Sequence, residues 1–207
     1  MNFRFYSKYR LQFFDSEKYP VIEIGGKKLI FIHINKNAGT SILTSFNKKK
    51  FHLTVEELTE LLGERTLKEC IKFAIIRNPY DRVVSQYKHR VKTNQSNLNF
   101  ENIDINEWVK SVFSENTNLQ YRDKNRMFLT QLEWLKDKYG VIQVDEILMF
   151  DKLKYDFDRF CKKYSLDTKL NHENKSDFIY SDSLNQSSKV IIYNYFKEDF
   201  LYFGFDK

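Results

Sequence analysis

Two short apolar runs, each followed by a polar segment that leads into a helix, constrain the fold of this chain most. Residues 21–34 are rich in isoleucine on both sides of Gly25-Gly26, which predicts a β-hairpin that leads into a buried strand. Phe73–Ile76 is a continuous apolar run of the kind found in parallel strands that are buried on both faces. Such units favour a mostly parallel sheet flanked by helices.

Helix-start signals accompany these strands. Asn78 and Pro79 have the residue types of an N-cap and a first helical position, and Thr54 with Glu57 has the spacing of a capping box. Helices are expected over about residues 40–46, 54–62, 105–113, 125–139, 151–164 and 187–202, with a further strand over 144–150. Strands that alternate with helices predict the α/β class, in which ligands bind beyond the carboxyl ends of the strands.

The composition predicts one globular domain. Of the 207 residues, 42% are hydrophobic and 16% are aromatic, which is enough apolar material for a buried core. Without repeats or a proline-rich linker, a single domain over residues 1–207 is expected, with a core of about 28–205 and an N-terminal extension and hairpin over 1–27. Cys70 and Cys161 are too few for a disulfide framework, so we expect free thiols in a reducing compartment.

The N-terminal residues and the charge bear on location and partners. Arg4, Lys8 and Arg10 stand among aromatic residues, so this end lacks the continuous apolar region of a signal peptide. No run approaches the roughly 18 apolar residues of a membrane span. The sequence therefore predicts a cytoplasmic protein without stable membrane insertion. The net charge of +6 is compatible with an anionic partner and equally with a solvated surface.

The first polar segment, residues 34–41, reads Ile-Asn-Lys-Asn-Ala-Gly-Thr-Ser at a predicted strand–helix junction. Backbone N–H groups at such a junction, together with Lys36, Thr40 and Ser41, make an oxyanion cradle. The segment is not a Walker A loop, because Lys36 precedes Gly39 instead of following it. The alternative is an ordinary glycine-containing turn.

The second polar segment, residues 77–85, places Arg77 at the carboxyl end of a strand and Ser85 about two helical turns further on. The alternative is that Arg77 pairs with a carboxylate and that Ser85 is a surface hydroxyl. Taken together, two oxyanion sites at adjacent strand ends fit a nucleotide that carries charge at both its 5′ and its 3′ positions.

These segments resemble the nucleotide motifs of the carbohydrate-type (family 2) sulfotransferases, which use 3′-phosphoadenosine 5′-phosphosulfate (PAPS). Residues 31–41 match F-x-H-I-P-K-T-A-G-T-S except at Asn35 and Asn37, and residues 77–85 match R-N-P-[YW]-[DE]-R-L-V-S with Val83 for leucine. The resemblance implies a P-loop-NTPase-like sulfotransferase fold. It also implies a 3′-phosphate held by Arg77 and Ser85, and a 5′-phosphosulfate cradle of Asn35, Lys36, Asn37, Ala38, Gly39, Thr40 and Ser41.

Weaker similarities extend over about residues 28–205. Residues 131–135 resemble Q-x-x-W-L, residues 144–151 resemble V-D-x-I-x-x-F-E, residues 170–176 resemble L-P-H-x-N-K-S, and residues 195–205 resemble the closing Y-x-x-D-F-x-x-F-G-Y. The third of these implies that Lys175 and Ser176 help to close over the phosphates of the nucleotide. Asn35 replaces a proline that would stiffen the loop, and Asn37 replaces a hydroxyl that could donate to the phosphosulfate.

The resemblance also implies catalytic groups. Lys36 is the candidate to stabilise charge on the bridging and leaving oxygens during sulfuryl transfer. His52 lies in a segment similar to H-x-T-x-x-E-[LI], where relatives that sulfate sugar hydroxyls are thought to place a histidine base. Glu56 and Glu57 compete for that role, and the alternative for His52 is a surface position at a helix start. His33 is expected to be a buried core residue near the site.

The sequence thus predicts a PAPS-dependent sulfotransferase that needs no metal and that acts on a carbohydrate hydroxyl. The alternatives are a P-loop-like nucleotide or small-molecule kinase and a non-catalytic polyanion-binding domain. The missing G-K-[ST] sequence counts against the kinase. Nucleic acid is not expected as a partner, because Lys48–Lys50 fits a solvated helix end and the aromatic residues have the spacing of core residues. Tyr80, Tyr87 and Trp108 are expected to pack in the core, and the alternative is that they line a sugar site.

Overall fold

The computed structural model describes residues 20–115, 117–170 and 183–207. The chain divides into two compact units. The sheet unit comprises residues 1–76 and 131–174, and the helical unit comprises residues 77–130 and 175–207. The expectation of one domain over residues 1–207 stays a prediction, and residues 1–19 of the expected N-terminal extension lie outside the described residues.

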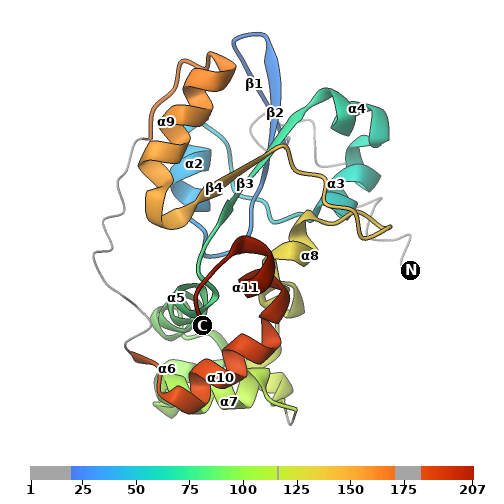
Figure 1. Cartoon of the computed structure of the whole chain (residues 1–207). Coiled ribbons are helices and arrows are strands. Elements are labelled where there is room, and N and C mark those ends of the chain that lie inside the picture. Colours follow the sequence, from blue (N-terminus) through green and yellow to red (C-terminus); the bar gives the residue numbers. More distant parts are fainter. Residues whose placement is uncertain (1–19, 116, 171–182) are drawn as a thin grey trace. The chain divides into compact units, whose positions relative to one another are not determined.

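A four-stranded sheet in the order β1-β2-β3-β4 forms the centre of the sheet unit (Figure 1). Its strands are β1 (Val21–Ile24), β2 (Lys27–Ile32), β3 (Ile71–Ile76) and β4 (Glu146–Met149). β1 and β2 are antiparallel, whereas β2 pairs with β3 and β3 with β4 in parallel. Gly25 and Gly26 have φ of 55° and 72° in the β1–β2 turn, as a two-residue turn with positive φ requires. The predicted hairpin and the α/β class are confirmed.

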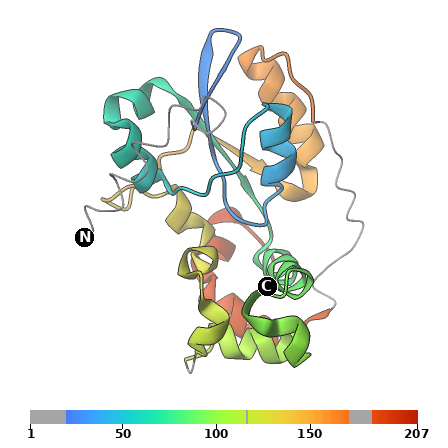
Figure 2. The ribbon, with the colours of Figure 1, turned by 180° about the vertical axis from the view of Figure 1, so that it is seen from behind.

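Helices cover both faces of this sheet, as the two opposite views in Figures 1 and 2 show. α2 (Gly39–Ser45) and α9 (Leu153–Tyr164), which the short helix η4 (Phe150–Lys152) precedes, pack on one face. α3 (Val55–Leu62) and α4 (Glu64–Glu69) lie on the other side, with α8 (Gln131–Leu135) beside α3. Because side chains alternate along a strand, Leu29 and Phe31 of β2 belong to the core beneath α2 and α9.

The helical unit is built around the long helix α5 (Pro79–Lys92). Its other elements are η1 (Gln95–Asn97), α6 (Leu98–Glu101), α7 (Ile105–Phe113), η2 (Leu119–Arg122), η3 (Asn125–Phe128), α10 (Gln186–Tyr195) and α11 (Lys197–Phe203). Its core gathers aromatic and branched side chains from these helices, among them Trp108 and Phe128. Tyr80 and Tyr87 also pack in or against this core, which is the position that their spacing predicted.

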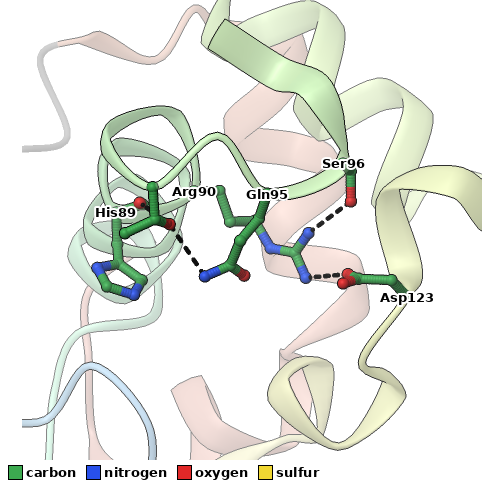
Figure 3. Close-up of polar contacts among 6 residues, drawn as sticks. His89, Arg90, Gln95, Ser96 and Asp123 are labelled. Atoms are coloured by element: carbon green, nitrogen blue, oxygen red, sulfur yellow. Dashed lines mark hydrogen bonds and ion pairs between the residues drawn. The ribbon is translucent and has the colours of Figure 1, made fainter.

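A buried arginine ties the loop after α5 to the segment that follows η2 (Figure 3). Arg90 is 2% exposed, and its guanidinium donates to Ser96 Oγ at 3.2 Å and to Asp123 Oδ1 at 2.6 Å. It also lies 5.0 Å from the centroid of the Phe128 ring. A buried charge is tolerated only when it is paired in this way, so the contacts hold the ends of three segments together.

Local helix signals predicted some boundaries well. α3 begins after Thr54, whose hydroxyl accepts from Glu57 N while the Glu57 carboxylate accepts from Thr54 N, so the capping box is confirmed. α5 begins after Asn78, whose side chain accepts from Tyr80 N at 2.9 Å. The expected helix over residues 105–113 is α7.

Two expected helices are wrong in their extent. Residues 125–139 form η3 and α8 instead of one helix, because Leu129 between them leaves the helical conformation with a ψ of 147°. The Leu129 carbonyl accepts from the Arg82 side chain at 2.9 Å. Beyond α8, the Asp137 carboxylate accepts from Tyr139 N and Val141 N, which folds the chain into a turn. Residues 187–202 divide at Phe196, the C-cap of α10, into α10 and α11.

Two further expectations concerned the state of the cysteines and the presence of membrane-spanning segments. Cys70 and Cys161 are buried and free, so the prediction of free thiols is confirmed. Within residues 20–115, 117–170 and 183–207, no helix is both long and apolar enough to cross a membrane.

Candidate active site

The phosphosulfate-type loop is the segment of residues 34–41 that the resemblance assigned to the 5′-phosphosulfate. It follows β2 and runs into the first turn of α2 within the sheet unit. Lys36 and Ala38 have φ of 67° and 54°, so two alternate positions of the loop take the left-handed conformation. Ala38 is also the N-cap of α2 and offers no side-chain hydrogen bond to its first turn. Lys36 is half-buried, Thr40 is exposed and Ser41 is buried. Residues in the left-handed conformation within a tight turn are the element from which backbone anion-binding loops are built.

Gly39 is required by the packing beneath this loop. A Cβ atom at this position would lie 1.8 Å from His33 Nε2 and 2.0 Å from His33 Cδ2. The imidazole of His33 therefore lies directly against the Gly39 backbone. His33 is 4% exposed, as expected of a core residue near the site, and its role in shaping the loop was not apparent from the sequence.

Asn37 anchors the loop to the rest of the sheet unit. Its Nδ2 donates to the Ile75 carbonyl of β3 at 2.7 Å and to Gln131 Oε1 of α8 at 2.6 Å. Asn37 and Gln131 are both 0% exposed. Since the amide of Asn37 is buried, a contact with the nucleotide would come from its backbone N–H. Its assignment to nucleotide binding, like that of the buried Asn35, stays a prediction.

His52 is held in one orientation by three contacts. Its Nδ1 lies 2.9 Å from the His33 carbonyl oxygen, and because a carbonyl only accepts, Nδ1 carries the proton and Nε2 is the basic atom. The rings of His52 and His33 are 4.0 Å apart between centroids. The ring of Trp134, which is itself fully buried, meets His52 edge-on at 6.2 Å.

His33 is a neutral imidazole. Its Nδ1 lies 3.0 Å from the Phe51 carbonyl, which again requires a proton on Nδ1. Burial is the main cause that lowers the pKa of His33 from 6.5 to about 3, and the charge that His52 can carry lowers it further. His33 is therefore not the proton acceptor of this pair near neutral pH.

The two glutamates that compete with His52 differ in their surroundings. Glu57 accepts from Thr54 N at 2.8 Å and from the Thr54 hydroxyl at 3.3 Å, so its carboxylate serves the capping box. Glu56 lines a cavity of about 300 Å³ together with Glu60 and Tyr139. Among the two, Glu56 is the one whose carboxylate is not committed to the helix cap.

The second motif belongs to the helical unit. Arg77 directly follows β3 and is 5% exposed, and Ser85 lies half-buried on α5. The first motif thus belongs to the sheet unit and the second to the helical unit. Arg77 and Ser85 are therefore described only by their surroundings in the helical unit. Lys175 and Ser176, the residues expected to close over the phosphates, lie outside the described residues. In the part of the chain that the structure describes, no group of three or more His, Cys, Asp or Glu side chains could hold a metal.

The structure defines an α/β sheet unit in which a short loop joins β2 to α2, and comparison with known families assigns the chain. Residues 21–206 match the model of the Sulfotransferase family, in the family 2 class. The chain therefore belongs to the sulfotransferase family and is a transferase. No curated protein and no solved structure matches it.

Proposed function

We propose that this sulfotransferase moves the sulfuryl group of PAPS to a hydroxyl of a carbohydrate. The observation that carries the proposal is that one residue of the sheet unit, His33, contacts both the loop and the proposed base. The His33 imidazole lies against Gly39 of the phosphosulfate-type loop, and its ring centroid is 4.0 Å from that of His52. His33 thus links the loop proposed for the donor to a histidine whose Nδ1 proton is assigned by its hydrogen bond.

In this proposal the reaction is an in-line displacement at sulfur. The bond between sulfur and the oxygen of the 5′-phosphate breaks while the bond to the acceptor oxygen forms, and 3′-phosphoadenosine 5′-phosphate leaves. Lys36 provides positive charge where negative charge develops on the departing phosphate. The acceptor proton goes to His52 Nε2, because Nδ1 already carries a proton and donates to the His33 carbonyl.

The remaining assignments rest on the motifs. Arg77 and Ser85 hold the 3′-phosphate, and a guanidinium suits the geometry of a phosphate. Lys175 and Ser176 are assigned to closure over the phosphates by the resemblance of their segment. No metal is needed in this scheme, because cationic side chains and N–H donors meet the phosphates. The family match favours sulfuryl transfer over the kinase and polyanion-binding alternatives.

The acceptor class rests on the likeness to the carbohydrate-type members. Residues 31–41 and 77–85 carry that likeness, and His52 stands where relatives that sulfate sugar hydroxyls are thought to have a base. The cytoplasmic location expected from the sequence stays a prediction.

Calorimetry tests the nucleotide assignment. We expect 3′-phosphoadenosine 5′-phosphate to bind without metal and more tightly than adenosine 5′-phosphate. Arg77→Ala should weaken binding of the bisphosphate by about 2 kcal/mol, the size of a charge-assisted contact, and leave binding of the monophosphate nearly unchanged. Arg65→Ala is the matched control, because the Arg65 side chain is 95% exposed on α4. Equal affinity of the wild type for both nucleotides would refute the role of Arg77 and Ser85.

Turnover tests the base. With labelled PAPS and a panel of saccharides, His52→Ala should lower kcat about 10²-fold, flatten the acidic limb of the pH–rate profile and leave nucleotide affinity nearly unchanged. A His52→Ala enzyme with full turnover and an unaltered acidic limb would move the base to Glu56 or Glu57. The same measurement on Glu56→Gln and Glu57→Gln would then choose between them.

A further inference from the structure

We propose that His33 is a positioning residue that fixes the tautomer and orientation of His52 and that links this base to the phosphosulfate-type loop through its contact with Gly39. The proposal deepens the proposed function and rests on it for the role of His52. His33 itself touches neither the acceptor nor the sulfuryl group in this scheme. It acts through His52 and through the backbone of Gly39.

Reciprocal hydrogen bonds join the two histidines. The His33 side chain donates from Nδ1 to the Phe51 carbonyl at 3.0 Å, and the His52 side chain donates from Nδ1 to the His33 carbonyl at 2.9 Å. Each histidine side chain therefore binds the backbone of the segment that carries the other. This pair of hydrogen bonds joins residue 33, directly after β2, to residues 51 and 52, which precede α3.

Ring packing fixes the same geometry from the sides. The His33 ring lies between Phe31, at 5.5 Å between centroids, and His52, at 4.0 Å. Its Nε2 edge meets the backbone of Gly39, where a Cβ atom would not fit. These contacts pack the His33 ring in the orientation in which its Nδ1 donates to the Phe51 carbonyl.

Charge supports this division of roles. The groups that act on His33 electrostatically are His52 and Lys50, both of which disfavour a positive His33. Because His33 remains neutral, it does not repel the proton that His52 must accept in the proposed reaction. His52 is the proposed base, and His33 holds it in place.

A purely structural His33 would contribute stability without controlling the proton on His52. Two variants separate these roles. His33→Asn keeps an N–H donor close to the position of Nδ1 and loses the ring, whereas His33→Leu keeps a similar volume and loses the donor. His89→Asn, a change at an exposed histidine of α5, is the matched control.

The first readout needs no acceptor and no turnover. Nitrogen NMR of the imidazoles in the full chain should show His52 protonated at Nδ1 in the wild type and in His89→Asn. The carbonyl that accepts from His52 Nδ1 is a backbone group and is present in every variant, so His33→Leu acts by removing the side-chain donor to the Phe51 carbonyl that holds the segment of His52 against residue 33. His33→Leu should therefore show a mixture of the two His52 tautomers, and His33→Asn should restore the Nδ1–H form. A wild-type His52 protonated at Nε2 would overturn the proposal even if no variant folds, and so would an unchanged tautomer in a folded His33→Leu protein.

The second readout is kinetic. His33→Leu should lower kcat about 10-fold, the size typical of lost positioning around a functional histidine, with the KM for PAPS nearly unchanged and with His33→Asn restoring most of the rate. An unchanged kcat in a folded His33→Leu enzyme would overturn the proposal. If His52→Ala keeps full turnover, the proposed base is wrong, and the NMR result still decides whether His33 controls the tautomer.

Discussion

Acidification should destabilise the sheet unit through His33. Burial holds the pKa of this ring at about 3 in the folded chain, against 6.5 when it is exposed. Between these values the unfolded chain binds a proton at His33 that the folded chain does not, so stability falls as the pH drops through this window. Above 6.5 the ring is neutral in both states, and below about 3 the loss is complete.

The size of the loss follows from the pKa difference. Each pH unit below 6.5 removes about 1.4 kcal/mol until the folded pKa is reached, so a change from about pH 8 to about pH 5 costs about 2 kcal/mol through His33. His33→Asn cannot take up this proton. Its free energy of unfolding should therefore fall by about 2 kcal/mol less than that of the wild type over the same pH change.

Urea denaturation followed by tryptophan fluorescence measures this difference. Trp134 lies in the sheet unit and Trp108 in the helical unit, so a Trp108→Phe background makes the signal specific for the unit that contains His33. His89→Asn, which removes an exposed imidazole from the helical unit, is the control for the loss of a histidine outside the sheet unit. If His33→Asn lost as much stability as the wild type between the two pH values, the assignment of a buried, neutral His33 would be refuted.

Three further changes test the packing and the site. Gly39→Ala should destabilise the chain by about 1–3 kcal/mol through the clash with His33, and a double-mutant cycle with His33→Ala should recover part of that loss; full additivity would contradict the contact. Asp123→Asn should cost about 2 kcal/mol in urea denaturation, because it leaves the buried Arg90 without its anionic partner; no change would show that the pair contributes nothing. Lys36→Ala should lower kcat about 10²-fold at every pH while circular dichroism stays unchanged, and a loss confined to one limb of the pH–rate profile would assign Lys36 a proton-transfer role instead.

Local sequence signals predicted several elements because their physics acts within one or two turns of chain. The side chains of Thr54 and Glu57, three residues apart, each accept a hydrogen bond from the backbone N–H of the other residue. Gly25-Gly26 supplies the positive φ of the β1–β2 turn. Asn78 and Pro79 start α5 for equally local reasons. The motif residues Lys36, Arg77 and Ser85 were found as a pattern, and their grouping into one nucleotide site stays a prediction.

Other helix boundaries depended on distant partners. The break between η3 and α8 coincides with the Leu129 carbonyl, which accepts from the Arg82 side chain 47 residues earlier in the chain. Helical propensity over residues 125–139 contains no information about that donor. A single tertiary hydrogen bond of this kind outweighs the small differences in propensity between neighbouring residues.

By itself, the sequence determined the α/β class, the hairpin, the capping box of Thr54 and Glu57, and the family. Only the tertiary structure decided that the Asn37 amide turns inward to Gln131, 94 residues away, and that His33 holds His52 across 19 residues. Both outcomes depend on which carbonyl or side-chain oxygen lies within hydrogen-bond distance once the sheet and its helices have packed. The residue type determines whether a side chain can donate or accept a hydrogen bond, and the packed structure determines which group lies close enough to be its partner.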